Sequence, residues 1–221
     1  MAAQASQSAS KKVVDSWKAK KWYVVIAPNF LNNMEAAEIP AVSDEAMVNR
    51  IIELPLKDIT HELSHMYTTV RLRISEITGK KALAKFIGHS VAKEYMRTLA
   101  RRKRDLVDIV LPVKSKDGVE FRVKVLVVTA NPASVEQKHA IRQSVVKELK
   151  KRTSSTEFGQ IVLDVLYNRT SEALHKSLVK ILPIRRVEVW KTELKEEFDT
   201  ESKEETNDSS PTQTEPVPAT V

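Results

Sequence analysis

The sequence predicts an α+β protein whose core is an antiparallel, barrel-like β-sheet flanked by α-helices, with disordered N- and C-terminal tails. Three observations predict this class. Strand patterns come first along the chain and helical patterns gather late. Turn signals join neighbouring strands as hairpins, which makes them antiparallel. Both ends are polar and lack hydrophobic periodicity, which is typical of disorder.

Composition divides the chain into a disordered tail at residues 1–12, a single domain at 13–195 and an acidic disordered tail at 196–221. A chain of 221 residues can bury one substantial core or two small ones. We expect one compact body between the tails.

The first segments predict short strands. The aromatic and β-branched run Trp22–Ile26 is typical of a strand. Residues 43–49 predict a helical turn, with Ser43 or Asp44 as its cap. Residues 51–56 are a short apolar run with a proline and are also strand-like.

A hairpin and a helix are expected next. Apolar and polar residues alternate over 66–77, the period of a half-buried strand, and after the turn Thr78–Lys80 the chain returns over 82–87. Gly88 is then expected to open a helix that ends in the basic run Arg101–Arg104. The predicted apolar stripe of this helix is Val91, Tyr95, Met96 and Leu99.

The rest of the body predicts a second hairpin and three helices. Residues 106–114 and 119–127 flank the turn Ser115–Gly118 and alternate as half-buried strands do. Ser134 and Gln137 have the spacing of a capping box, which predicts a helix to about Arg152. The remaining expected elements are helices at 156–166 and 170–182 and a closing strand at 184–190.

Charge is distributed unevenly along the chain. Of its 36 basic and 29 acidic residues, one basic and eight acidic residues fall in 196–221, so this segment carries −7 and residues 1–195 carry +14. A body this basic attracts polyanions, of which nucleic acid is the commonest. We therefore expect a nucleic-acid-binding body and an acidic tail that is dispensable for RNA binding.

Composition also excludes several classes of protein. The chain has no cysteine, which excludes a disulfide scaffold, a cysteine-ligated zinc site and thiol catalysis. No apolar run approaches the roughly 20 residues that span a bilayer, and residues 1–10 do not resemble a signal peptide. With four glycines the chain can hardly build a phosphate-cradling loop. We expect a cytoplasmic protein without a membrane partner or a metal.

One motif typical of enzymes lies at residues 61–65, which read His-Glu-Leu-Ser-His. On a helix this pattern presents two histidines to zinc, with Glu62 as general base. Here it lies between strand-like segments, and a catalytic zinc also needs a third protein ligand. The other histidines, His89, His139 and His175, occur singly. We interpret residues 61–65 as a connector between strands.

Basic residues concentrate in clusters that we interpret as a distributed phosphate-binding surface. The first cluster interleaves cations with Trp17, which suits stacking on unpaired bases. We assign Trp22 and Tyr23 to the core of the sheet. The predicted RNA contacts are Lys11, Lys12, Trp17, Lys18, Lys20, Lys21, Arg101, Arg102, Lys103, Arg104, Lys147, Lys150, Lys151, Arg152, Arg185 and Arg186.

Four segments resemble a known protein family: Lys21–Pro28, Phe86–His89, Tyr95–Lys103 and Lys116–Val123. In order and spacing they are similar to the archaeal and eukaryotic small-subunit ribosomal proteins S-one-e, also called S-three-a-e. The resemblance extends from about residue 14 to 191. The short stretch before the first lysines lacks the lysine-rich extension of the eukaryotic members and resembles the archaeal ones.

The resemblance implies a structural, ribosomal RNA-binding protein of the small (30S) subunit that takes part in translation. It implies contacts with the small-subunit (16S) ribosomal RNA and with neighbouring proteins on the subunit platform, and with mRNA near the exit site. It also implies no enzymatic activity and no cofactor.

Two other functions remain open from the residues themselves. The same charge pattern suits a free-standing RNA-binding regulator. A zinc hydrolase using His61, Glu62 and His65 is the other alternative. Co-sedimentation with 30S particles at high salt tests the first, and metal analysis tests the second.

Overall fold

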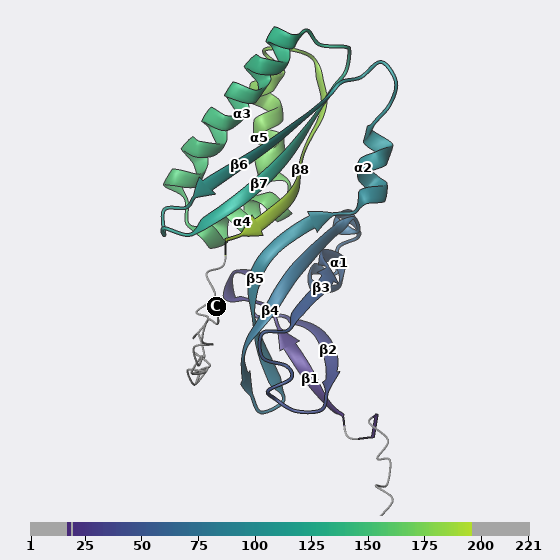
Figure 1. Ribbon diagram of the computed structural model, residues 1–221, viewed down its shortest axis with the longest axis vertical. Coiled ribbons are helices and arrows are strands. Elements are labelled where there is room, and N and C mark those ends of the chain that lie inside the picture. Colours follow the sequence, from purple (N-terminus) through teal and green to yellow (C-terminus); the bar gives the residue numbers. More distant parts are fainter. Residues whose placement is uncertain (1–16, 19, 196–221) are drawn as a thin grey trace, which may run out of the picture.

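The computed structural model describes residues 17, 18 and 20–195, which form an open, mixed eight-stranded β-sheet with five α-helices (Figure 1). The strands are β1 (Lys21–Ile26), β2 (Glu35–Ala41), β3 (Ile51–Pro55), β4 (Thr68–Thr78), β5 (Lys81–Val91), β6 (Leu106–Lys114), β7 (Glu120–Thr129) and β8 (Ile184–Leu194). The helices are α1 (Leu56–Thr60), α2 (Lys93–Leu99), α3 (Val135–Ser155), α4 (Phe158–Leu166) and α5 (Arg169–Leu178), with short 3₁₀ helices η1 (Asn29–Leu31) and η2 (Leu63–His65). The predicted tails at 1–12 and 196–221 lie outside the described residues.

Strand β5 connects two parts of the sheet. One edge of β5 pairs antiparallel with β4 along its length. The other edge is divided, because Lys81–Leu83 pair in parallel with β1 and Gly88–Ser90 pair antiparallel with β8. The resulting strand order is β2-β1-β5-β8-β7-β6, with β3 and β4 attached to the other side of β5.

The α+β class is confirmed, but the antiparallel, barrel-like sheet is wrong. Strand β1 runs parallel to β5, so the sheet is mixed. Within the described part of the chain, β2, β3 and β6 each pair with one strand, so the sheet does not close. The physical reason is the divided edge of β5, which sends β1–β2 and β8–β7–β6 away from each other instead of bringing them together.

The predicted helix from Gly88 is wrong at its start. Strand β5 continues to Val91, and α2 has no buried residue. A Cβ on Gly88 would lie 2.2 Å from the backbone oxygen of Thr192 in β8. The glycine therefore permits a close approach of two strands, which is a recognised reason for glycine inside a strand.

Other predicted elements agree with the structure. Both hairpins are confirmed, and the capping box of Ser134 and Gln137 opens α3. Residues 43–49 make a turn in which the amide of Val48 donates to the carbonyl of Asp44 at 3.3 Å, without a regular helix. Strand β2 and the short helix α1 were not predicted.

Two hydrophobic cores form, one in the N-terminal half (residues 20–91) and one in the C-terminal half (residues 106–195). Helix α4 serves both, because Ile161 and Val165 belong to the C-terminal core whereas Val162 and Leu166 belong to the N-terminal core. The ring of Phe158 lies between the two halves, with centroid distances of 6.1 Å to Phe86 and 5.4 Å to Phe121. The two cores are therefore joined by one helix.

A buried histidine also links the halves at the β5–β8 junction, where Gly88–Ser90 pair with Lys191–Glu193. His89 is 2% exposed. Its Nε2 lies 3.0 Å from the carbonyl of Val189, so this nitrogen donates, and its Nδ1 accepts from the Thr192 hydroxyl at 2.7 Å. Burial lowers the pKa of His89 to about 4, and the ring is therefore neutral at pH 7.

Helices α3, α4 and α5 lie on one side of β6–β8, and among the described residues the other side is open except where Tyr95 of α2 lies against the buried Glu188. Helix α3 packs on β6 and α5 on β8, and both lie on the same side of β6–β8 as α4 (Figure 1). Helix α2 lies apart from them, beside the upper end of β5 (Figure 1). No helix in the described ranges is long and apolar enough to cross a membrane.

Candidate nucleic-acid interface

The first predicted cluster precedes and begins β1. Trp17, Lys18 and Lys21 are exposed, and the ammonium of Lys20 lies 4.5 Å from the centroid of the Trp17 ring. Trp22 is 56% exposed, so its assignment to the core is wrong, whereas Tyr23 is buried as predicted. Two cations of this cluster lie outside the described residues: Lys11 and Lys12.

The second predicted cluster, Arg101–Arg104, occupies the loop between α2 and β6 and not the end of a helix. Arg101, Arg102 and Lys103 are exposed and Arg104 is half-buried. Lys103 adopts a left-handed backbone conformation with φ of 62°. Three cations of this loop can therefore reach a phosphate without burying charge.

The third predicted cluster lies in the last turns of α3. Lys147, Lys150 and Lys151 are exposed, and the Nε of Arg152 forms an ion pair with Glu148 at 3.2 Å. The fourth cluster begins β8, where Arg185 is exposed. Helices α2 and α3 lie on opposite sides of the C-terminal sheet (Figure 1). The structure therefore does not gather the predicted clusters on one face.

Arg186 belongs to a network that connects β8 with α2. It forms an ion pair with Glu188, and its guanidinium lies 5.5 Å from the ring centroid of Tyr95. The hydroxyl of Tyr95 donates to Glu188 at 3.1 Å, and its ring stacks on Tyr67 with centroids 4.8 Å apart. Burial and the nearby carboxylate of Glu188 raise the pKa of Tyr95 to about 12.

A further basic surface follows from the strand register. One cross-strand row runs from Glu53 in β3 through Arg71, Gly88 and Glu193 to Arg122 in β7. Directly paired residues point to the same face of a sheet, and here that face is opposite to both cores. We call it the open sheet face. It includes the charged residues Glu53, Arg71, Arg73, Glu76, Lys81, Lys85, Asp108, Lys114, Glu120, Arg122, Lys124, Arg186, Glu188, Lys191, Glu193 and Lys195.

Among these residues, cations outnumber carboxylates by ten to six. The carboxylate of Glu193 has three basic neighbours, whose side-chain nitrogens lie at 2.5 Å (Lys191), 3.3 Å (Lys124) and 4.0 Å (Arg122). Hydrogen bonds from Lys191 lower the pKa of Glu193 despite partial burial. One carboxylate cannot neutralise three cations, so the surface retains positive charge for an anionic partner.

An aromatic side chain lies among these cations. The Lys124 ammonium is 5.5 Å from the centroid of Trp190, whose indole nitrogen donates to Asp108 at 3.3 Å. Tryptophan beside lysine on a sheet can combine base stacking with phosphate contact. The same combination of tryptophan and lysine was predicted around Trp17, but here it lies on a sheet.

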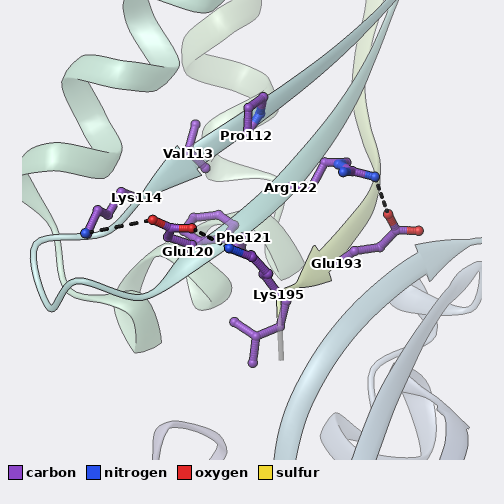
Figure 2. Close-up of a pocket in the computed structure, with 9 residues that line it drawn as sticks. Pro112, Val113, Lys114, Glu120, Phe121, Arg122, Glu193 and Lys195 are labelled. Atoms are coloured by element: carbon purple, nitrogen blue, oxygen red, sulfur yellow. Dashed lines mark hydrogen bonds and ion pairs between the residues drawn. The ribbon is translucent and has the colours of Figure 1, made fainter. Parts of the chain in front are cut away.

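The open sheet face ends in a hollow where β8 leaves the sheet. A cavity of about 420 Å³ lies between the β6–β7 hairpin and the end of β8, and Figure 2 shows Lys114 and Lys195 directed toward Glu120 there. Their ammonium groups lie 3.9 Å and 3.3 Å from the Glu120 carboxylate. Arg122 and Glu193 line the far side. Charged side chains therefore line both sides of the hollow, and the apolar residues Val113, Phe121 and Leu194 also line it.

Sequence reasoning missed most of the open sheet face. The alternation of Arg122 and Lys124 with buried valines was visible in the sequence, and so was that of Arg71 and Arg73. The pairing of β5 with β8, which places these two sets on one surface, could not be recognised from the local sequence pattern. That pairing joins residues about a hundred positions apart.

The connector interpretation of residues 61–65 is confirmed. His61 ends α1 in a left-handed conformation with φ of 58°, and η2 follows. His65 is 7% exposed, its ring meets Tyr167 edge-on at 5.3 Å, and its Nε2 lies 3.3 Å from Glu62. The two histidines therefore do not share a helical face. Within the described ranges, no three His, Cys, Asp or Glu side chains are grouped so that they could hold a metal.

Comparison with known proteins gives a consistent result. Residues 8–197 match the model of the Ribosomal S3Ae family. The small ribosomal subunit protein eS1 of Desulfurococcus amylolyticus is 36% identical over 182 residues, covering 82% of this chain and 85% of that protein. The protein of the same name from Pyrobaculum neutrophilum is 37% identical, covering 80% of each chain. That from Sulfurisphaera tokodaii is 34% identical, covering 85% of this chain and 97% of the relative.

The resemblance seen in the four sequence segments is thereby confirmed over most of the described residues. The match includes every strand and helix of the sheet that carries the cationic surface. The chain belongs to the Ribosomal S3Ae family.

Proposed function

We propose that the protein is a structural constituent of the small (30S) ribosomal subunit, that it binds 16S ribosomal RNA in the cytoplasm, and that it is not an enzyme. The observation that carries this proposal is the family match over residues 8–197, together with relatives named small ribosomal subunit protein eS1. The relatives are matched over 80% or more of their own length, so the similarity extends over most of each protein.

The open sheet face supports RNA as the partner. Its excess of cations over carboxylates favours phosphates, and Trp190 offers a ring for a base. Of the remaining predicted clusters, Arg186 at the start of β8 lies on this face by its pairing with Val128, whereas those at β1, the α2–β6 loop and the end of α3 lie on other elements. A protein with basic groups on several sides suits a particle in which RNA surrounds it. We place it on the subunit platform near the mRNA exit, beside other ribosomal proteins, as the family resemblance implies.

A salt series with 16S ribosomal RNA tests the RNA surface. Replacing Arg122, Lys124 and Lys191 by Ala removes three cations of the open sheet face, and each lost phosphate contact should lower the slope of log K against log salt by about 0.7–0.9. A control variant that loses the same charge carries Ala at Lys116, Arg142 and Lys180, which are exposed elsewhere. Equal losses in both variants would mean that only net charge matters.

Co-sedimentation separates a ribosomal constituent from a free-standing regulator. The purified protein should incorporate into 30S particles and remain bound at high salt, because RNA and protein enclose it. A protein that binds isolated RNA but leaves the particles completely in the salt wash would contradict the proposal. Zinc at one equivalent per chain, lost on replacing His61 and His65 by Ala, would contradict the prediction that residues 61–65 bind no structural or catalytic metal.

A further inference from the structure

The loop that holds the His-Glu-Leu-Ser-His motif presents large apolar side chains to solvent. Leu63 is 78% exposed, Met66 51% and Tyr67 46%. The loop is nevertheless well fixed, because the His61 amide donates to the carbonyl of Lys57 at 2.7 Å and the Ala92 amide donates to the carbonyl of Tyr67 at 2.8 Å. A rigid loop that exposes apolar side chains indicates a contact surface.

Tyr67 is held in a fixed orientation by its neighbours. Its ring stacks on Tyr95 at 4.8 Å with an angle of 20° between the planes. Tyr95 is itself held by its hydrogen bond to Glu188, which is 5% exposed, and by the guanidinium of Arg186 at 5.5 Å. These contacts fix the ring of Tyr67 while almost half of its surface stays accessible.

The surroundings of Tyr67 are basic. Helix α2, which carries Tyr95, also exposes Lys93 and Arg97, and it leads directly into the loop Arg101–Lys103. Acidic residues are also present: Glu94 lies on the same helix, and Glu62 lies in the loop itself, where it pairs with His65. A flat, preset aromatic ring beside several cations matches the two parts of an unpaired nucleotide, its base and its phosphate.

We propose that Tyr67, supported by Tyr95 and Arg186, is a stacking surface for one unpaired base of RNA. The proposal rests on the proposed function, since it specifies how that RNA is held. Phosphates flanking the base lie within the reach of the cations of α2 and the following loop. Stacking makes no use of base edges, so this site accepts any base and favours unpaired over paired RNA.

A protein partner is the competing occupant, and charge argues against it. A protein contact would use the apolar side chains of the loop but would need its own carboxylates to pair with the cations of α2 and the following loop, whereas every RNA carries phosphates beside its bases. RNA satisfies both kinds of group at once. The distinction is testable, because loss of the Tyr67 ring should weaken RNA binding only if the ring contacts RNA.

The test uses the full chain with a 12-nucleotide single strand that carries one 2-aminopurine, and the blunt duplex of the same sequence. Wild-type protein should quench the fluorescent base in the single strand. Tyr67→Leu keeps an apolar side chain but loses the ring, and it should weaken single-strand binding about 5- to 150-fold while leaving the salt slope unchanged. Tyr67→Phe keeps the ring and should bind within about twofold of wild type.

The outcomes separate this inference from the proposed function. If Tyr67→Leu folds, by circular dichroism, and binds and quenches the single strand as wild type does, while 16S RNA binding persists, the stacking surface is disproved and the proposed function stands. If the same variant binds RNA normally but fails to enter 30S particles, a protein contact replaces the stacking surface. If wild type binds none of these RNAs, the proposed function itself fails.

Discussion

The C-terminal half buries one face of three strands under helices α3, α4 and α5, whereas the N-terminal half encloses its core with five strands and only short helices of its own. In the C-terminal half β6 shows plain alternation, with every second residue buried, although the pairing of β7 with β8 also contains two register shifts. In the N-terminal half the strands are interrupted by bulges and one-turn helices. Local patterns therefore define the C-terminal half, and long-range pairing defines the N-terminal half.

The C-terminal half has longer helices than the N-terminal half, but neither half is independent of the other. Helix α4 contributes to both cores, and β5 pairs with β8. The N-terminal core is closed in part by Val162 and Leu166, which come from the C-terminal half. We therefore expect the two halves to unfold together.

The largest expected effect comes from a cavity in either core. Leu72→Ala in the N-terminal core and Leu174→Ala in the C-terminal core each remove a fully buried side chain and should each lower the free energy of unfolding by about 2–5 kcal/mol. Urea unfolding followed by circular dichroism and by tryptophan fluorescence should give one coincident transition for each variant. Two separate transitions would show that the halves are independent domains.

Gly88→Ala tests the junction between the halves. The new methyl group would lie 2.2 Å from the Thr192 backbone oxygen, so the two strands must move apart, and the expected loss is about 3 kcal/mol. Gly159→Ala is the matched control, because its Cβ would lie 3.4 Å from a Phe30 side chain and alanine favours a helix. Equal stabilities of the two variants would mean that β5 and β8 tolerate separation.

Stability should fall in mild acid because of His89. Its pKa is about 4 in the folded protein and about 6.5 in the unfolded chain, so the unfolded chain binds more protons between these values. The contribution is complete above pH 6.5 and is lost as the pH falls toward 4, by about 3 kcal/mol. Urea midpoints from pH 7 to 4 measure it. His89→Gln should flatten this dependence, whereas the exposed His139→Gln should preserve it.

The smallest effect on folding is expected from the α2–β6 loop, which lies between the halves. Replacing Arg101, Arg102 and Arg104 by Ala should change the free energy of unfolding by less than about 0.5 kcal/mol. The variant should bind 16S RNA more weakly and with a lower salt slope. Wild-type affinity, slope and entry into 30S particles would identify these arginines as an ordinary solvated surface.

The sequence predicted the C-terminal half well because its signals are local. The capping box at Ser134, the turn Ser115–Gly118 and the four-residue spacing of Ile141, Val145 and Leu149 all act within one element, and all are confirmed. Strand β2 was missed because Glu35–Ala41 contains a proline and two glutamates and pairs with β1 alone.

The remaining errors have one physical origin. The pairing of β5 with β8 kept Gly88–Val91 extended where the sequence pattern favoured a helix, and it divided the edge of β5 so that no barrel forms. Tertiary context decided both outcomes, and neither is encoded in the neighbouring residues. The individual RNA contacts stay predictions, because they depend on the partner as well as on this chain.

The β5–β8 junction also sets an order of events during synthesis. His89 and Thr192 are 103 residues apart, so at translation rates of about 5–20 residues per second the end of β5 leaves the ribosome roughly 5–20 s before its partner. During that interval the upper edge of β5 has free backbone groups, which are a template for pairing with other chains. Strand β8 is the last to be made, and its arrival covers this edge and holds His89 inside the protein. A nascent chain stalled before β8 should therefore expose an unpaired strand edge, prone to pair with other chains, that β8 covers in the complete chain.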